Sequence, residues 1–266
     1  MGGLGGSTTR GLEAALRRDR LMVALSLAGV AGLAWVYLWR HAASMPAGDG
    51  ASMALSMPAM PAMDPAALAL SFAMWAVMMA GMMLPGAAPT VLLYGAMVRK
   101  HAERGAVLPA VWIFVGGYLL VWGGFSLAAA LLQAALEHAA LLTPMMASAS
   151  KPLNGVLLLA AGIYQLTPLK NLCLSKCRDP VRFFMTHWRP GVAGALRMGI
   201  SHGAYCVGCC WMLMLLLFAV GVMNLAWVAL LAAFVLLEKL LPAGPLSSRL
   251  TGAALILLGL GILASA

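Results

Sequence analysis

The sequence has very few charged residues for its length. Of its 266 residues, 17 are Lys or Arg and 8 are Asp or Glu, so charged side chains make up only 9% of the chain, whereas hydrophobic ones make up 63%. Soluble domains carry about 25% charged residues, and this shortage excludes that class. Such a composition implies charge-free runs of about 18 or more apolar residues, long enough to cross a hydrocarbon core of roughly 30 Å. We therefore predict an all-α membrane protein, a polytopic helical bundle.

The sequence also lacks the motifs of several common chemistries. It contains no nucleotide-binding loop, no dinucleotide fingerprint and no catalytic serine motif of the usual kinds, so an ATP-hydrolysing pump on this chain is not expected. Only one of the five His residues, His202, lies well inside an apolar segment, which disfavours a haem held by two histidines. The five Cys residues do not have the spacing of a disulfide framework, so metal or thiol redox chemistry stays open.

Seven apolar segments predict about seven transmembrane helices. The basic residues form short clusters between these segments, which is typical of membrane proteins and gives no reason to expect a nucleic-acid partner. Of the 17 Lys and Arg residues, only Arg40 and Lys151 fall on the side opposite the amino terminus, so the positive-inside rule places the amino terminus in the cytoplasm. The predicted helices cover residues 21–39, 67–98, 106–132, 153–169, 198–222, 225–241 and 250–265.

The chain then divides into four parts. Residues 1–20 form a basic cytoplasmic tail, residues 21–39 the first transmembrane helix, residues 40–66 an extracytoplasmic Met-rich loop, and residues 67–266 a core membrane domain of about six transmembrane helices. The second helix is longer than a bilayer requires, so we expect it to tilt, kink or break near Pro85.

The strongest chemical signal is a group of His and Cys residues in the fifth predicted helix. His202, Cys206, Cys209 and Cys210 share about one third of the helix circumference at roughly 100° per residue, and imidazole and thiolate are ligands that Cu(I) and Zn(II) prefer. His202 and Cys210 are about 12 Å apart along the axis, so one helix cannot wrap one ion with all four. Three arrangements stay open: one ion with further ligands from another helix, two adjacent ions, or a series of ligands along which a soft ion steps. The alternative is that these cysteines are small packing residues.

Methionine is the second signal. A thioether binds Cu(I) without deprotonation and also works in an oxidising compartment, so a Met-rich outer loop fits copper capture. A Met stripe on the second predicted helix has the same ligand chemistry, but packing is the interpretation we favour there, since Met is an adaptable apolar filler. The loop residues are Met45, Met53, Met57, Met60 and Met63, and the stripe is Met74, Met78 and Met82.

Two further features lie near the predicted inner face. Cys173 and Cys177 are one helical turn apart and could receive or donate a metal, although unused reduced thiols are an equal alternative. Glu238 and Lys239 are expected to pair with Arg197 or to extend to the membrane interface.

Several segments resemble a known family. The motif His202–Trp211, which reads HGxYCxGCCW, occurs with characteristic runs at Met74–Pro85, Tyr164–Lys170 and Leu236–Lys239. Together they resemble a bacterial family of predicted metal-binding integral membrane proteins, classed as a domain of unknown function. The resemblance covers about residues 70 to 260. It implies a multi-pass protein of the bacterial cytoplasmic (inner) membrane that binds metal, and it supplies neither the metal nor an activity.

Our leading hypothesis is a copper-handling membrane protein. It would bind Cu(I) or a similar soft metal, with zinc as an alternative, at the intramembrane Cys/His cluster for transport, delivery or storage. One alternative is a membrane-embedded metal or thiol redox enzyme or enzyme subunit that uses the same cluster; another is a structural subunit of a membrane complex. The expected partners are the lipid bilayer, the soft metal ion, and partner subunits or a second copy of the chain. Whether the chain is an enzyme stays open.

The predicted topology can be tested by labelling single introduced cysteines with a membrane-impermeant thiol reagent, in a background without the five native cysteines. We expect position 57 to react from outside, and positions 99 and 178 to react only after the membrane is opened, because basic clusters stay in the cytoplasm. Labelling of position 57 from the cytoplasmic side would contradict both the topology and the capture of copper by the loop.

Overall fold

The computed structural model describes residues 5–43, 64–101, 107–143, 146, 148–241 and 246–265. Helices are the regular structure in these ranges, and the one β-bridge found there joins Leu142 to Ser148. This confirms the all-helical prediction. The helices are α1 (Gly5–Ala43), α3 (Pro65–His101), α4 (Val107–His138), α5 (Lys151–Leu166), α6 (Pro168–Arg178), α7 (Pro180–His187), α8 (Gly191–Leu215), α9 (Leu217–Val220), α10 (Leu225–Leu240) and α11 (Leu246–Ala264).

Fewer helices are long enough to cross a membrane than the seven we expected. In the described part of the chain, five are long and apolar enough, or six if the bent pair α5 and α6 counts as one span. The predicted helix at residues 225–241 is present as α10, but its 16 residues rise only about 24 Å. It is therefore shorter than the roughly 30 Å hydrocarbon core. The five are Arg17–Ala43, Pro65–Arg99, Val107–His138, Gly191–Val220 and Leu246–Ala264.

The predicted helix at residues 153–169 is broken at Thr167, where α5 and α6 meet at an angle of 65°. Thr167 precedes Pro168, whose ring disfavours a helical conformation of the residue before it, and Thr167 is extended, with φ −70° and ψ 145°. Its hydroxyl donates to the Tyr164 carbonyl at 2.7 Å and accepts from the Lys170 amide at 3.4 Å. One residue therefore caps both helices and fixes the bend.

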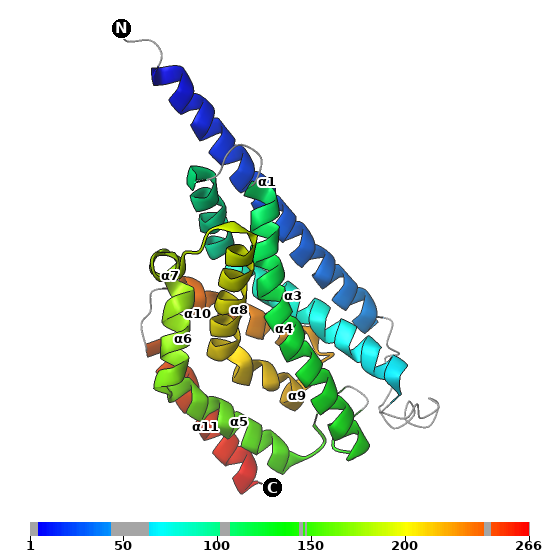
Figure 1. Ribbon diagram of the computed structural model, residues 1–266. Coiled ribbons are helices and arrows are strands. Elements are labelled where there is room, and N and C mark those ends of the chain that lie inside the picture. Colours follow the sequence, from blue (N-terminus) through cyan, green and yellow to red (C-terminus); the bar gives the residue numbers. More distant parts are fainter. Residues whose placement is uncertain are drawn as a thin grey trace.

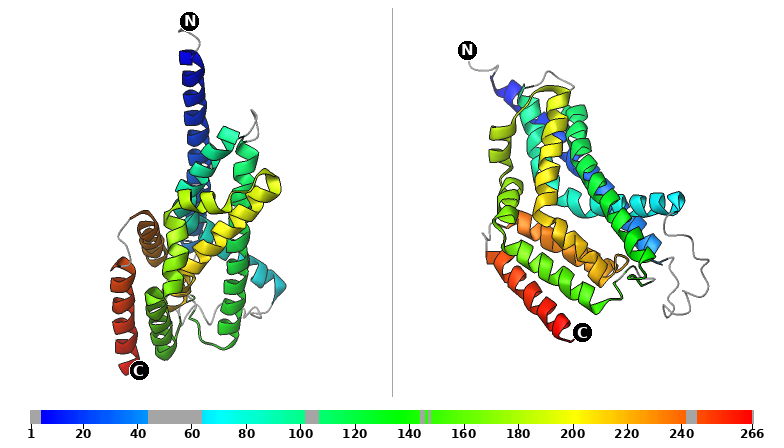
Figure 2. Two further views of the ribbon diagram at one scale, coloured as in Figure 1. Left: turned by 60° about the vertical axis from the view of Figure 1, so that its left-hand side comes forward. Right: turned by 60° about the horizontal axis from the view of Figure 1, so that its bottom comes forward.

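Helix α3, in contrast, continues through Pro85 and Pro89 without a break. Its ribbon changes direction along its length (Figure 2), as expected where a proline removes a backbone hydrogen bond. The expected tilt, kink or break near Pro85 is thus a bend within one helix.

The helices pack in pairs (Figure 1), and glycines lie at the contacts of two of these pairs. Helix α1 lies along α3, α4 lies against α8, and α5 lies against α11. A Cβ on Gly199 of α8 would collide with the Phe114 carbonyl of α4, and a Cβ on Gly162 of α5 would lie 2.8 Å from the Gly252 carbonyl of α11. Only glycine permits such close approach of two helix backbones, so these positions fix how α8 and α11 are seated.

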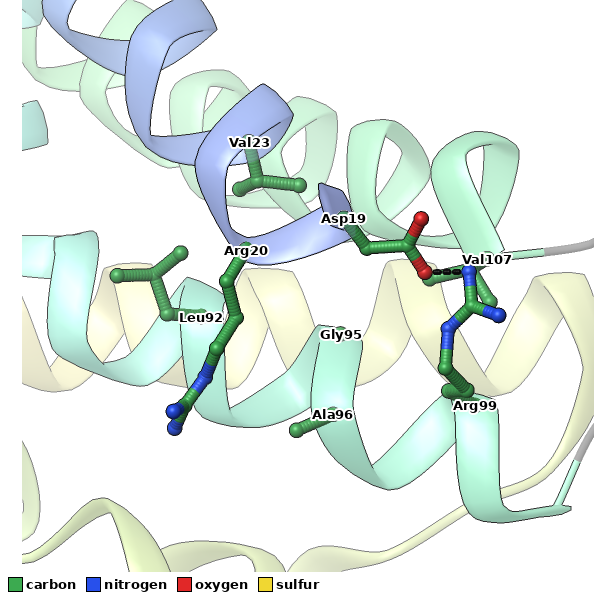
Figure 3. A pocket seen from close by; sticks show the side chains of 8 residues that line it. All are labelled: Asp19, Arg20, Val23, Leu92, Gly95, Ala96, Arg99 and Val107. Carbon is green, nitrogen blue, oxygen red and sulfur yellow. Dashed lines mark ion pairs between the residues drawn. The ribbon is translucent and has the colours of Figure 1, made fainter. Parts of the chain in front are cut away.

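An ion pair joins α1 to α3 at the basic end of both helices. The Asp19 carboxylate is bound to the Arg99 guanidinium, whose side chain is 23% exposed. Figure 3 shows the Asp19 side chain directed toward Arg99, whereas Arg20 points away from it. The pair anchors the peripheral helix α1 to the rest of the bundle.

A second ion pair lies deeper. The Lys170 ammonium of α6 contacts both Glu238 carboxylate oxygens of α10, at 2.6 and 2.9 Å, and also binds the Gln165 side-chain oxygen. The Ser248 hydroxyl of α11 donates to the same carboxylate at 3.0 Å, and the Arg178 Nε donates to the Glu238 backbone carbonyl at 2.7 Å. Lys170 is fully buried and Glu238 nearly so. This network holds α5, α6, α10 and α11 together.

Removing one partner of this pair should destabilise the protein strongly, because the remaining charge stays buried without compensation. We expect Lys170→Met to lower the free energy of unfolding in detergent by about 3–5 kcal/mol. The double variant Lys170→Met/Glu238→Gln should recover most of that loss. The matched control is Lys176→Met, which changes a half-buried lysine on the same helix. Equal losses for the single and double variants in SDS titration would contradict the pairing.

Candidate metal centre

The predicted His and Cys residues lie together on the buried side of α8. His202, Cys206, Cys209 and Cys210 are each at most 2% exposed. The spacing along the helix therefore predicted their common face correctly. The Cys209 and Cys210 thiols both donate to the backbone carbonyl of Cys206, at 3.1 and 3.0 Å. The same two thiols also contact the Cys206 thiol.

Helix α6 brings the other two cysteines to the same place. The buried Cys177 thiol contacts the thiols of Cys206 and Cys209. Cys173 lies one turn away, and its Sγ would be 2.8 Å from a Cβ on Gly208. All five cysteines are free and meet where α6 packs on α8. Cys173 and Cys177, which the sequence marked only as accessory candidates, thus adjoin the α8 cluster.

Two polar residues from other helices complete the surroundings of Cys206. The Lys239 ammonium of α10 donates to Cys206 Sγ at 3.0 Å. The Tyr118 hydroxyl of α4 lies 3.1 Å from the same sulfur and donates to the Met83 carbonyl of α3 at 3.1 Å. Cys206 is therefore the point at which side chains of three other helices, α4, α6 and α10, come together.

The expectation for Glu238 and Lys239 was wrong. Neither pairs with Arg197 or extends to an interface: Glu238 binds Lys170, and Lys239 is 6% exposed and points to Cys206. The cause is the register of α10, which turns both side chains into the bundle. Sequence reasoning missed Lys239, Tyr118 and Lys170 as neighbours of the site. An ionisable residue inside an apolar run was the available signal for the two lysines.

His202 is enclosed by aromatic rings. Its ring centroid lies 5.4 Å from that of Phe183, 5.7 Å from Tyr118 and 6.1 Å from Phe114. The Nδ1 atom is buried and has no hydrogen-bond partner among the described residues. A buried imidazole nitrogen without a partner is costly, and a soft metal ion is one group that could satisfy it.

The helical methionines are buried in the hydrophobic core. Met74, Met78 and Met82 are each at most 3% exposed, and Met79 and Met83 are fully buried. Their placement agrees with the packing interpretation, and a role in metal binding stays a prediction. The loop residues Met45, Met53, Met57, Met60 and Met63 lie outside the described residues.

The thiols offer pairs of ligands. Across the ranges that the structure describes, no group of three or more His, Cys, Asp or Glu side chains is arranged to hold a metal ion. Cys177 and Cys206, from two different helices, form a contact that a two-coordinate soft ion could bridge.

Comparison with known families supports copper as the metal. Residues 72–262 match the model of a family described as PpoB2, copper chaperone. This range contains the five cysteines, His202, Tyr118 and both buried lysines. No curated protein and no solved structure matches the chain.

The contact between α6 and α8 predicts a disulfide under oxidation. The membrane-permeable oxidant diamide should join Cys177 to Cys206 or Cys209, because these thiols already touch. Trypsin cleavage after Lys176, Arg178 and Arg197 separates Cys173, Cys177 and the α8 cysteines, so mass spectrometry can assign the cross-linked peptides. Cys177→Ser should abolish the cross-link, and Cys173→Ser should not. A product that depends on Cys173 instead would contradict this arrangement.

Proposed function

The chain belongs to the PpoB2 copper chaperone family, and we propose that it is a membrane-embedded carrier that takes Cu(I) as cargo between α6 and α8. The observation that carries the proposal is the gathering of free, buried thiols from two helices around Cys206. Thiolates bind Cu(I) strongly, and buried free thiols in an apolar bundle are protected from competing ligands. In this proposal Cys206 and Cys177 form the first ligand pair.

The spacing of ligands on α8 suggests how the cargo moves. His202, Cys206, Cys210 and Met214 follow one another at intervals of four residues, or about 6 Å, and all four are buried. A Cu(I) ion held by two ligands can accept a third before it loses one, so neighbouring ligands permit stepwise exchange. We propose Cys209 and Cys210 as the ligands that exchange with the first pair.

The proposed membrane arrangement keeps the predicted domains. Residues 1–20 lie in the cytoplasm, the predicted loop at residues 40–66 is extracytoplasmic and its methionines collect copper, and residues 67–266 form the core membrane domain, in the bacterial cytoplasmic (inner) membrane. Helix α1 reaches into that loop range as far as Ala43, and α3 begins within it at Pro65. Charge distribution supports this orientation, since the basic residues cluster on one side. Partner subunits or a second copy would receive or supply the ion.

One observation favours a second candidate function. The contact between Cys177 and the α8 thiols would also suit a dithiol that is oxidised and reduced by a membrane-bound partner. Such a thiol redox protein would lose its activity in Cys177→Ser but would not need to hold copper at stoichiometric amounts. Copper content therefore separates the two functions.

The proposal predicts copper binding that depends on Cys206 and Cys177. Purified protein in detergent, titrated with Cu(I) against a chromophoric chelator, should bind close to one ion tightly. Cys206→Ser and Cys177→Ser should each weaken binding by on the order of a hundredfold or more, because a hydroxyl does not replace a thiolate as a Cu(I) ligand.

The matched control is Cys173→Ser, since its sulfur faces Gly208. The Cu(I) affinity of the Cys173→Ser variant should stay close to that of the unmodified protein. We expect His202→Ala to weaken binding less than the thiol changes. An unchanged copper affinity in the double variant Cys206→Ser/Cys177→Ser would contradict the proposed carrier.

A further inference from the structure

A basic hollow lies where the chain passes from α7 through a short connection into α8 (Figure 1). Its volume is about 380 Å³, within the range of roughly 300–1,000 Å³ that small-molecule sites occupy. Among the described residues that line it there is no Asp or Glu. The lining residues are His187, Arg189, Arg197, Met198, Ile200 and Ser201.

The connection between the two helices is shaped by two glycines. Gly191 has a φ of +80°, which residues with a Cβ rarely adopt, so the chain can turn directly after Pro190. A Cβ on Gly194 would collide with the Arg189 carbonyl. The connection therefore lies against the first turn of α8, and Arg189 lines the same hollow as Arg197.

The other polar walls of the hollow come from α7 and α8. Ser201 lies one helical turn after Arg197, on the same face of α8. The His187 ring is held by stacking on Phe183, with centroids 4.8 Å apart, and its Nδ1 lies 2.7 Å from the Thr186 hydroxyl. Guanidinium and hydroxyl groups are donors that phosphate oxygens accept from, and the planar guanidinium matches phosphate geometry.

The two arginines at the hollow carry uncompensated charge. Both are exposed, and neither forms an ion pair with another residue in the ranges that the structure describes. The ion pairs found in those ranges join α1 to α3 and α6 to α10. Two guanidinium groups that line one hollow repel each other, and an anion bound between them would relieve this repulsion.

The apolar surroundings of the hollow favour an anion that belongs to a lipid. Val192, Leu196 and Ile200 are exposed on α8 and follow one another at intervals of four residues, so they share one face. Met185 of α7 is exposed as well. Helix α8 belongs to a segment that is long and apolar enough to cross a membrane, where such a face contacts hydrocarbon. An apolar face that leads to a basic hollow offers an acyl chain a place next to its headgroup.

We propose that this hollow binds the phosphate headgroup of an anionic phospholipid such as phosphatidylglycerol, whose acyl chain lies along Val192, Leu196 and Ile200. Basic pockets between membrane helices are known to bind anionic headgroups. A zwitterionic lipid has the same phosphate, but its ammonium would lie close to both arginines. The proposal concerns the bilayer around the protein, so it goes beyond copper handling and does not depend on it.

The test measures lipid binding to the full-length protein in detergent by native mass spectrometry. Phosphatidylglycerol and phosphatidylcholine with the same acyl chains are titrated against the unmodified protein, Arg189→Gln/Arg197→Gln and Lys176→Gln/Arg182→Gln. The last variant is the matched control, because it removes two positive charges from a neighbouring hollow of about 620 Å³ that is also lined by the Asp179 carboxylate.

We expect the unmodified protein to bind phosphatidylglycerol more tightly than phosphatidylcholine. Arg189→Gln/Arg197→Gln should lower the phosphatidylglycerol affinity by on the order of ten- to thirtyfold, the size expected when two basic contacts to an anionic headgroup are lost. The control variant should keep most of the preference. Because both arginines are exposed, the melting temperature without lipid should not change. Equal losses of affinity in the two double variants would overturn the proposal, since they would show a general attraction to basic surface.

Competition distinguishes a lipid from soluble anions. Inorganic phosphate and a soluble polyglutamate peptide should displace phosphatidylglycerol only at much higher concentrations than the lipid itself, because neither has an acyl chain to place on α8. Displacement by inorganic phosphate at a concentration similar to that of the lipid would overturn the proposal in favour of a free anion. Displacement by the peptide at such a concentration would overturn it in favour of an acidic protein partner.

Discussion

The burial of charge in an apolar bundle is the constraint on which the rest of this structure depends. A lone charge at this depth is expensive, so each buried ionisable group must find a partner. The Lys170–Glu238 pair satisfies this for α6 and α10 and draws in Ser248 of α11. Because Glu238 is held toward α6, the register of α10 is fixed, and the adjacent Lys239 is directed to Cys206. The structural ion pair thereby positions a residue of the candidate metal centre.

Helix packing through glycine brings the ligands of this centre within reach of one another. At Gly199, α8 sits against the backbone of α4, which places Tyr118 next to both His202 and Cys206. The capped bend at Thr167 releases α6 from the direction of α5 and lets it lie along α8. Two local features of the sequence, a small residue and a Thr-Pro step, thus decide which side chains surround Cys206.

What could be predicted from the sequence depended on whether the relevant spacing lay within one helix. The common face of His202, Cys206, Cys209 and Cys210 followed from the helical repeat, and the helical class followed from the shortage of charge. The contact of Cys177 with α8 could not be predicted, because it depends on how α7 reverses the chain between the two helices. The inward direction of Lys239 was missed for a similar reason. It depends on the pairing of the adjacent Glu238 with Lys170, which lies 68 residues earlier in the sequence. The five or six candidate spans fall short of the expected seven or so because α10, although apolar, is only 16 residues long, and an apolar run does not reveal where its helix ends.

The arrangement of the thiols bears on what kind of copper protein this is. A storage site or a catalytic centre gains from ligands that already converge, because a closed coordination shell holds its ion for long times. A carrier gains from the opposite arrangement, in which two ligands bind and others wait one helical turn away. The Cys209 and Cys210 thiols donate to the Cys206 carbonyl and also contact the Cys206 thiol, so they lie beside the proposed first ligand pair. In the proposed carrier, these neighbouring thiols would take the ion from the first ligand pair, which suits transfer along α8.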